Sequence, residues 1–589
     1  MNIDLRANPF FLTEEDCDWV HETIAAMNDE EKVGQLFFQL TSSQKEEDLI
    51  ELIQTYHLGG CRYNPAPARE VWKQNRILQE NSKIPLFIAC NTESGGDGAC
   101  TDGTYIGNGM KIGATGNHDY AEDMGRMGNA EAAAIGCNMA FAPVCDIYYN
   151  PMNTEISTRA FSNDPEMVKK CSVEYVRGAH QNTDFACVAK HFPGNGVDYR
   201  DAHLSNHVND FSPKHWDETY GMVYKELIEN GVEGIMGGHI MLPEYVRELA
   251  PELPEEEVWM PATLNKTLMT TLLRDKLGFQ GVVVTDASHM VAMTNQMTRK
   301  EMLPRAINAG CDMFLFFNDP QEDFQTMLTA YQRGVISEER MTEALTRILG
   351  IKARLQLHKK SAAEMVPEKD TLDRVLGNEE FKKKQSEISE KSLTLVKYKD
   401  KDVLPISPEK YKKVMIVHIK GHETGMVELL KLCGMEGKNP AETVKQKLCE
   451  RGYDAYVYES PLDQMKQKAL KGEKPDLNIY FAGKNAISEF REQADLVITL
   501  CDVMAGRPSF GMSKGGGEIP WYVFEVPVIA VGCGQPTMLL DIPQVRTYIN
   551  IYDAKENTLE KLIEALSSGA DAFVGKDPID SFCGLQDTK

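Results

Sequence analysis

Eight short apolar runs, separated by amphipathic segments with helical spacing, fill roughly the first 350 residues of this chain. Short runs that are apolar on both faces are typical of buried parallel strands, and the helical segments supply the crossovers that parallel strands require. Eight such units predict a (β/α)8 barrel of the TIM type, with an open doubly wound sheet as the alternative. The strand candidates are Val33–Leu40, Gly59–Tyr63, Pro85–Cys90, Met139–Val144, Phe185–Lys190, Gly234–Ile240, Gly281–Thr285 and Asp312–Phe317, and the helix candidates include Lys45–Tyr56, Ala68–Asn81, Pro165–Gln181 and Lys266–Leu277.

Polar side chains stand at the carboxyl ends of six of these runs, and this placement favours the barrel. In a barrel, all the strands end at one mouth, so these side chains would converge on a single site. They are Asn91 and Glu93 after the third run, Asp146 after the fourth, Lys190 and His191 at the fifth, His239 at the sixth, Asp286 at the seventh and Asn318 at the eighth.

A second alternating pattern follows a polar stretch. The helical segment Glu338–Leu357 gives way to HKKSAAEMVPEKD and further charged residues, which indicate a helical linker over 358–391. The sequence therefore predicts a barrel domain over 1–357 and a smaller α/β sandwich domain over 392–589. The strand candidates of the second domain are Ser392–Val396, Val414–His418, Ala455–Tyr458, Leu496–Leu500, Val526–Val531 and Thr547–Ile551.

The overall charge and composition exclude several classes of function. A net charge of −25 without a basic patch argues against nucleic-acid partners. No run of 18 apolar residues occurs, so we predict no membrane span. The N-terminal segment lacks the features of a signal peptide, and the 14 cysteines form no CxxC pair. We therefore expect a cytoplasmic protein with reduced thiols and no metal site, and the pattern leaves the oligomeric state open.

Asp286 ends the run GVVVTD, which is otherwise almost wholly apolar. A carboxylate at the end of a buried strand is costly unless another group pairs with it. One interpretation is a structural aspartate that caps the next helix. The other is a nucleophile that is held ionised by cations across the mouth, for which Lys190, His191 and Arg159 are candidates.

The segment Asp201-Ala202-His203 offers a group for proton transfer. Residues two apart in an extended loop face the same way, so the carboxylate can accept a hydrogen bond from the imidazole. Such a bond fixes the tautomer and raises the histidine pKa, although a surface Asp–His pair without function has the same sequence. An ionised nucleophile and a tuned histidine together suit a two-step displacement at an acetal carbon.

The motifs KHFPGNGVDYRDAH and LLRDKLGFQGVVVTD resemble glycoside hydrolase family 3, in its β-N-acetylhexosaminidase branch. The resemblance runs in order from Asp29 to Leu357 through CNMAFAPVCDIYYNP, STRAFSNDP, IMGGHIMLP and ERMTEALTRILGIKARLQL. It is weaker in SLTLVKYKDKDVLPI and QVRTYINIYDAKENTLEKLIEAL, which are similar to the C-terminal α/β domain of that family.

The resemblance implies a retaining mechanism with Asp286 as nucleophile and His203, oriented by Asp201, as acid/base. No metal or organic cofactor is implied, because side chains alone form and break the covalent intermediate. The β-glucosidase branch instead takes its acid/base from a glutamate of the second domain, for which Glu518 is the candidate. The residues expected to bind the sugar are Lys190, His191, Arg159, Asn91, Glu93 and Asp146.

Two departures from the family pattern leave the identity of the glycone open. The usual KHFPGHG reads KHFPGNG, with Asn195 in the second histidine position. The usual DQEGGR reads NTESGGDG, so that Asn91 or Glu93 replaces the sugar-binding aspartate and no arginine follows.

The leading hypothesis is therefore an exo-acting retaining β-N-acetylhexosaminidase. It would release a terminal N-acetylhexosamine, N-acetylglucosamine foremost, from a short oligosaccharide or glycoconjugate. The alternatives are a β-glycoside phosphorylase, a β-glucosidase of the same family, and a sugar-binding protein without catalytic activity.

Overall fold

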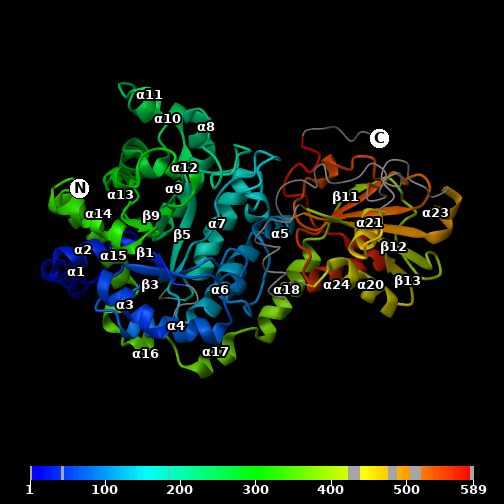
Figure 1. The fold of residues 1–589 in the computed structure, drawn as a ribbon, viewed down its shortest axis with the longest axis horizontal. Helices are drawn as coiled ribbons and strands as arrows, with labels where there is room; N and C mark the ends of the chain where they lie inside the picture. The colour runs from blue at the N-terminus through cyan, green and yellow to red at the C-terminus, as the bar shows by residue number, and fades with distance from the viewer. Residues whose placement is uncertain are drawn as a thin grey trace. The chain divides into compact units, whose positions relative to one another are not determined.

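The computed structural model describes residues 3–41, 45–182, 185–421, 438–459, 461–474, 487–503 and 519–583, which form two compact units (Figure 1). The first comprises Met1–Gly109 and His118–Lys384, and the second comprises Met110–Asn117 and Gln385–Lys589. Glu518, the alternative acid/base, lies outside the described residues. The division into domains at residues 357 and 391 stays a prediction about which parts of the chain fold independently.

The first unit is a closed barrel of eight parallel strands in the order β1-β10-β9-β7-β5-β4-β3-β2, as the sequence predicts. Most residues of these strands are buried, because the barrel interior covers one face and the surrounding helices cover the other. The strands are β1 (Phe37–Leu40), β2 (Gly60–Arg62), β3 (Phe87–Cys90), β4 (Met139–Ala140), β5 (Ala186–Phe192), β7 (Gly234–Gly237), β9 (Val282–Ala287) and β10 (Met313–Leu315).

Three strand boundaries differ from those predicted. The first strand begins at Phe37 because α2 (Asp29–Gly34), started by a capping box at Asn28, takes up the beginning of the predicted run. The sixth run is divided into β7 and β8 (Ile240–Met241), and β8 pairs with β6 (His207–Val208) in a separate two-stranded sheet. The seventh strand continues to Ala287, so that Asp286 lies within the strand.

Helices alternate with the barrel strands along the chain and surround them (Figure 1). In α15, for example, Met341, Leu345 and Ile348 are fully buried at helical spacing. The further helices up to residue 391 are α1 (Glu14–Ala26), α3 (Glu46–Tyr56), α4 (Ala68–Glu80), α6 (Asp119–Ala134), α7 (Pro165–Ala179), α8 (Pro213–Trp216), α9 (Met222–Glu229), α10 (Pro243–Leu249), α11 (Glu255–Val258), a π-helical segment (Thr267–Lys276), α12 (Val291–Thr294), α13 (Arg299–Ala309), α14 (Pro320–Gln332), α15 (Glu338–Arg354), α16 (Ala362–Met365), α17 (Lys369–Val375) and α18 (Glu379–Lys391), whose residues from Gln385 onward belong to the second unit.

The second unit is built on a six-stranded sheet in the order β11-β16-β15-β14-β12-β13, in which β11 runs antiparallel to its neighbour. Helices α20 (Pro440–Glu450) and α24 (Glu556–Ser568) share one apolar core with the sheet, and α23 (Ile487–Gln493) shares the core of the other face. This is the predicted three-layer α/β arrangement. The strands are β11 (Thr394–Tyr398), β12 (Lys413–Lys420), β13 (Asp454–Val457), β14 (Leu496–Asp502), β15 (Val528–Gly532) and β16 (Thr547–Asn550).

A segment from the first third of the chain belongs to the second unit. Residues 110–117, which include most of α5 (Gly109–Ala114), leave the barrel sequence and return to it. The fully buried ammonium of Lys111 donates hydrogen bonds to Asp553 Oδ2 (2.7 Å), Ser389 Oγ (2.9 Å) and Thr558 Oγ1 (2.6 Å). Sequence analysis places this segment in the barrel domain. Its membership of the second unit depends on contacts with residues more than 250 positions away, which the local sequence pattern does not indicate.

Within the described ranges, the cysteines are free thiols, and all but Cys449 and Cys583 are buried. None of the described helices combines the length and the apolar character that a bilayer crossing requires.

Candidate active site

The loop after β5 is fixed by hydrogen bonds to its backbone. Pro193 O accepts a hydrogen bond from Trp216 Nε1 (2.7 Å), and Gly194 O accepts one from Asn209 Nδ2 (3.1 Å). Gly194 has φ of 120°, and an added Cβ would lie 2.2 Å from the ring of Tyr220, so this turn requires glycine. The motif HFPGNG therefore builds a rigid support at the barrel mouth.

Lys190 and His191 lie at an irregularity of β5. The register of β5 against β7 shifts between Ala189 and Phe192, so the two intervening residues leave the regular ladder. Asp146 then orients His191: its Oδ2 lies 2.7 Å from His191 Nδ1, and its Oδ1 accepts the backbone N–H groups of His191 (3.2 Å) and Asn195 (2.7 Å). Asp146 is fully buried, and these hydrogen bonds fix the position of the His191 ring.

Glu93 lies between two cations. Its carboxylate is 2.5 Å from Lys190 Nζ and accepts hydrogen bonds from Arg159 Nε (2.8 Å) and Nη2 (2.9 Å). Burial would raise the pKa of Glu93, but Arg159 and Lys190 together hold it well below its usual range. Arg159, one of three candidates for holding Asp286 ionised, is paired with Glu93, and its Nη2 also lies 3.4 Å from His191 Nε2.

Asp286 is held ionised by its surroundings. Burial would raise its pKa, but the nearby imidazole of His191, the backbone N–H of Ala287 and the ammonium of Lys190 lower it below the ordinary value. The Ala287 N–H donates to Asp286 Oδ1 at 2.7 Å. The arrangement presents a carboxylate in the form that a nucleophile requires.

His239, for which the sequence predicts a place at a strand end but no specific role, lies beside Asp286. Its Nε2 is 3.1 Å from Ala287 O and its Nδ1 is 2.8 Å from Thr263 Oγ1. Because a carbonyl only accepts, we assign the ring proton to Nε2, so that Nδ1 accepts from the hydroxyl. Burial lowers the pKa of His239, which favours this neutral form.

Asp201 and His203 form a hydrogen-bonded dyad on the loop between β5 and β6. Asp201 Oδ1 lies 2.8 Å from His203 Nδ1 and accepts the backbone N–H of His203 at 2.8 Å. This bond raises the pKa of His203, and burial opposes it only in part. With Nδ1 engaged by the carboxylate, the Nε2 of a side chain that is 51% exposed is the atom left to exchange a proton.

The dyad loop is docked on the segment that follows Asp286. The N–H groups of Val291 and Ala292, at the start of α12, donate to His203 O (3.3 Å) and Ala202 O (3.0 Å). Ala202 also packs with Met290 and Ala292 in a small apolar cluster. Since α12 follows β9 directly, the nucleophile candidate and the proton-transfer candidate are held by one local structure.

The carboxylate of Glu155, which sequence analysis did not single out, lies behind the dyad. Its Oε2 accepts the N–H of Ala202 at 3.1 Å, and its Oε1 is 4.0 Å from His203 Nδ1. Glu155, Asp201 and His203 also place three oxygen and nitrogen atoms within 4.8 Å of one another, a donor set that a divalent cation could use. No motif marks Glu155, since it stands in an irregular loop 48 positions before the histidine.

Three asparagines near the strand ends, Asn91, Asn195 and Asn318, have no hydrogen bond to Glu93, Asp286 or His203 among the described contacts. The backbone N–H of Asn91 bonds to Gly98 O (3.3 Å), and its buried side-chain Oδ1 has no hydrogen-bond partner among the described residues. Asn318 is exposed, and its backbone N–H donates to Asp323 (2.7 Å). Asn195, the departure from the family motif, accepts a hydrogen bond from Asn153 through its side chain (3.0 Å).

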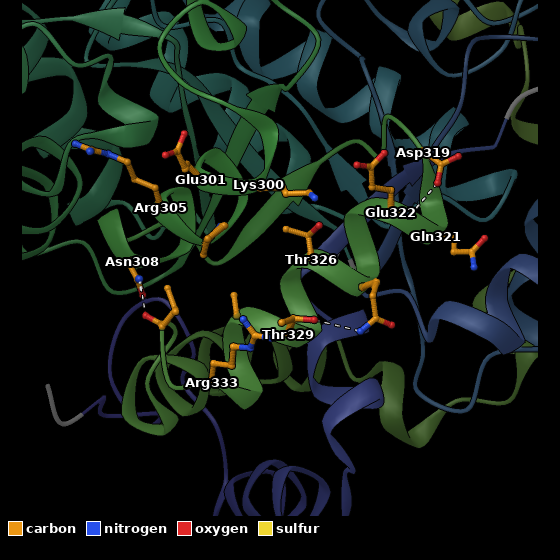
Figure 2. Close-up of a pocket in the computed structure, with 14 residues that line it drawn as sticks. Lys300, Glu301, Arg305, Asn308, Asp319, Gln321, Glu322, Thr326, Thr329 and Arg333 are labelled. Atoms are coloured by element: carbon orange, nitrogen blue, oxygen red, sulfur yellow. Dashed lines mark hydrogen bonds between the residues drawn. The ribbon is translucent and has the colours of Figure 1, made fainter.

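Hollows also lie outside this cluster. One of about 1010 Å³ is lined largely by the outer surfaces of α13 and α14, and Figure 2 shows its polar side chains partly hydrogen-bonded within the groove. No residue of the predicted site lines it, so we do not assign it to the substrate. A smaller hollow of about 540 Å³ lies beside the dyad loop and includes Tyr199, Arg200 and Trp259.

Comparison with known proteins identifies relatives along the whole chain. Residues 29–351 match the model of the glycosyl hydrolase family 3 N-terminal domain. A beta-N-acetylglucosaminidase/beta-glucosidase of Cellulomonas fimi is 36% identical over 591 residues, which cover 100% of both chains. Beta-hexosaminidase A of Pseudoalteromonas piscicida is 28% identical over 382 residues, which cover 61% of this chain and 62% of that relative.

Solved structures of family 3 enzymes and of a related phosphorylase are also similar to this chain over nearly its whole length. The beta-glucoside phosphorylase BglX bound to 2FGlc superposes with a TM-score of 0.88 at 33% identity, covering 99% of both chains. A family 3 beta-N-acetylglucosaminidase from Paenibacillus sp. str. FPU-7 superposes with a TM-score of 0.77 at 25% identity, covering 95% of this chain and 100% of that one. The family model covers more than half of the chain and a relative matches all of it, so this protein is an enzyme of glycoside hydrolase family 3.

Proposed function

We propose that the protein is a retaining, exo-acting β-N-acetylhexosaminidase, with Asp286 as nucleophile and His203 as acid/base. The observation that carries this proposal is the docking of the dyad loop on α12, directly after the strand that bears Asp286. A glycosidic bond placed between the two side chains would have a carboxylate on one side and an imidazole proton on the other. The Cellulomonas fimi relative, named for N-acetylglucosaminidase and glucosidase activities, supports this choice of substrate.

In the first step, a carboxylate oxygen of Asp286 attacks the anomeric carbon while the bond to the aglycone oxygen breaks. His203 Nε2 donates its proton to that oxygen, and a glycosyl ester remains on Asp286. In the second step, His203 Nε2 accepts a proton from water, the water oxygen bonds to the anomeric carbon, and the carboxylate leaves. Asp201 keeps the imidazole in the tautomer that serves both steps.

The glycone would be held by the group around Glu93. Lys190 and Arg159 both bond to this carboxylate, so they present their remaining N–H donors in fixed directions. A sugar hydroxyl can accept from these cations and donate to Glu93. Asp146 would act through His191, as an orienting residue that does not touch the sugar.

The test is a screen of the purified protein against aryl β-glycosides of N-acetylglucosamine, N-acetylgalactosamine, glucose and xylose. We expect the highest kcat/KM for the N-acetylglucosaminide, and loss of turnover in Asp286→Ala. A higher kcat/KM for the glucoside would overturn the assignment of substrate.

A second candidate function is phosphorolysis, in which phosphate replaces water in the second step. The similarity to a beta-glucoside phosphorylase over 99% of both chains favours it. A histidine also repels an incoming phosphate less than a carboxylate would. Sugar 1-phosphate formed in phosphate buffer would establish this activity, and free sugar as the only product would exclude it.

A further inference from the structure

Glu155 is a buried carboxylate to which the proposed mechanism gives no task. It lies in the loop after β4, and its side chain is 5% exposed. Arg159 donates to the backbone carbonyl of Glu155 (3.3 Å), whereas the cations of Arg159 and Lys190 pair with Glu93. A buried carboxylate is costly unless it stabilises something nearby.

A hydrogen bond from the Ala202 N–H to Glu155 fixes the backbone turn that carries Asp201 and His203. Ala202 stands between the aspartate and the histidine, and its N–H reaches Glu155 Oε2 at 3.1 Å. Its carbonyl accepts a second hydrogen bond, from Ala292 N at 3.0 Å. The turn is thereby fixed between two elements of the barrel mouth, and this fixes the direction of the imidazole.

Glu155 also contributes charge. Oε1 faces His203 Nδ1 at 4.0 Å, beyond the dyad hydrogen bond of 2.8 Å, and Oε2 lies 3.7 Å from Nδ1 of the fully buried His207. His207 Nδ1 donates instead to Arg200 O (2.7 Å). Two carboxylates therefore face the same nitrogen of the acid/base candidate, one in contact and one behind it.

We propose that Glu155 is a positioning residue that seats the Asp201–His203 dyad and stabilises the protonated imidazole by its charge. The inference rests on the proposed role of His203. The charged and titratable groups that face His203 are Asp201 on its own loop, Glu155 after β4, Asp286 on β9 and His239 after β7. His207 on β6 faces the two carboxylates, Glu155 and Asp201.

Two substitutions of Glu155 separate the effect of its hydrogen bond to the Ala202 N–H from the effect of its negative charge on His203. Glu155→Gln keeps an oxygen that can accept from Ala202 but removes the negative charge. We expect the alkaline limb of the kcat/KM profile to shift to lower pH, with a loss of about fivefold above the wild-type limb, as for a charge about 4 Å away in a water-like medium. Glu155→Ala also removes the acceptor of the Ala202 N–H. We expect kcat/KM to fall by a further 10- to 100-fold or so (about the range for a misplaced general acid), only for substrates with poor leaving groups.

The assay uses the full-length protein and aryl N-acetylglucosaminides with 2,4-dinitrophenyl and phenyl leaving groups, over a range of pH. Asp198→Asn is the matched control, because Asp198 is a buried carboxylate of the same loop that pairs with Arg200 and Val208 N. It has no contact with His203 in the structure, so we expect its alkaline limb to match the wild type.

The inference is overturned if the alkaline limb of Glu155→Gln matches the wild type while His203→Ala slows substrates with poor leaving groups far more than activated ones. If His203→Ala lacks that dependence, the proposed function itself fails, which is a separate outcome. Glu155→Gln remains decisive even if Glu155→Ala does not fold, because the amide preserves the shape of the side chain.

Discussion

Replacing Glu93 by glutamine removes the negative charge between Lys190 and Arg159 while retaining an oxygen that accepts hydrogen bonds. In the wild type, one carboxylate compensates two cations, and the Lys190 side chain is only 4% exposed. In the variant, the ammonium of Lys190 and the guanidinium of Arg159 lie against a neutral amide instead of the carboxylate that they share. We expect both the stability of the barrel and the binding of the glycone to suffer.

The geometry sets the expected magnitude. Breaking a buried ion pair by removing one partner costs about 3–5 kcal/mol. Glu93 and Arg159 are 18% and 31% exposed, so water recovers part of this loss. We therefore expect the free energy of unfolding to fall by about 2–4 kcal/mol, and KM to rise by about tenfold or more because the two cations lose their fixed directions.

Urea unfolding followed by tryptophan fluorescence measures the first quantity. Four of the five tryptophans, at positions 19, 72, 216 and 259, lie in the barrel unit, so the signal reports mainly on the barrel. Because the pKa of Glu93 lies below its usual range in the folded state, the wild-type advantage is full above the pKa of an unfolded glutamate, about 4.3, and shrinks as the pH falls below it.

Glu31→Gln is the matched control. Glu31 is also a mostly buried glutamate paired with a lysine, Lys83, but both precede their strands and so lie at the other end of the barrel. It should lower stability without a change in KM. If Glu93→Gln unfolds within about 0.5 kcal/mol of the wild type and keeps its KM, the carboxylate does not compensate the two cations, and our description of the glycone site is wrong.

Four further variants test the proposed chemistry. Asp286→Asn should lower kcat with aryl glycosides by at least about 10³-fold while the unfolding transition stays close to wild type, and activity within about tenfold would place the nucleophile elsewhere. His203→Ala should slow substrates with poor leaving groups by about 10²–10⁴ and activated aryl glycosides far less, as a series of leaving groups would measure. Asp201→Asn removes the carboxylate that raises the pKa of His203, so the alkaline limb of the pH–rate profile should shift to lower pH, and an unmoved limb would contradict the dyad. Glu518→Gln should leave the dependence on the leaving group unchanged, and the opposite result would favour a glucosidase-type acid/base.

Most of the fold could be predicted from the sequence because each barrel strand is a short apolar run between turn and helix signals. The strand boundaries differ from those predicted where two signals overlap. Val33 reads as the start of an apolar run, yet the capping box at Asn28 makes it part of a helix. Asp286 reads as the residue after a strand, yet β9 continues through it.

The site could be predicted as a group of residues but not as a network of contacts. Strand ends mark Glu93, Lys190 and Asp286 as neighbours, because topology brings them to one mouth. Periodicity does not determine that Arg159 turns to Glu93, nor that an irregular loop brings Glu155 behind His203. Such pairings depend on side-chain packing between segments that are distant in the sequence.

The passage of residues 110–117 into the second unit has a consequence for dividing the protein. A shortened chain that ends after the barrel would keep Lys111 but lose Ser389, Asp553 and Thr558, the oxygen atoms that bind its ammonium. It would carry an unsatisfied charge and an exposed patch in the middle of its catalytic sequence. A gene for the isolated barrel therefore needs a redesigned bridge between Gly109 and His118, and expression of the two halves as separate polypeptides should yield a folded pair only when both are present.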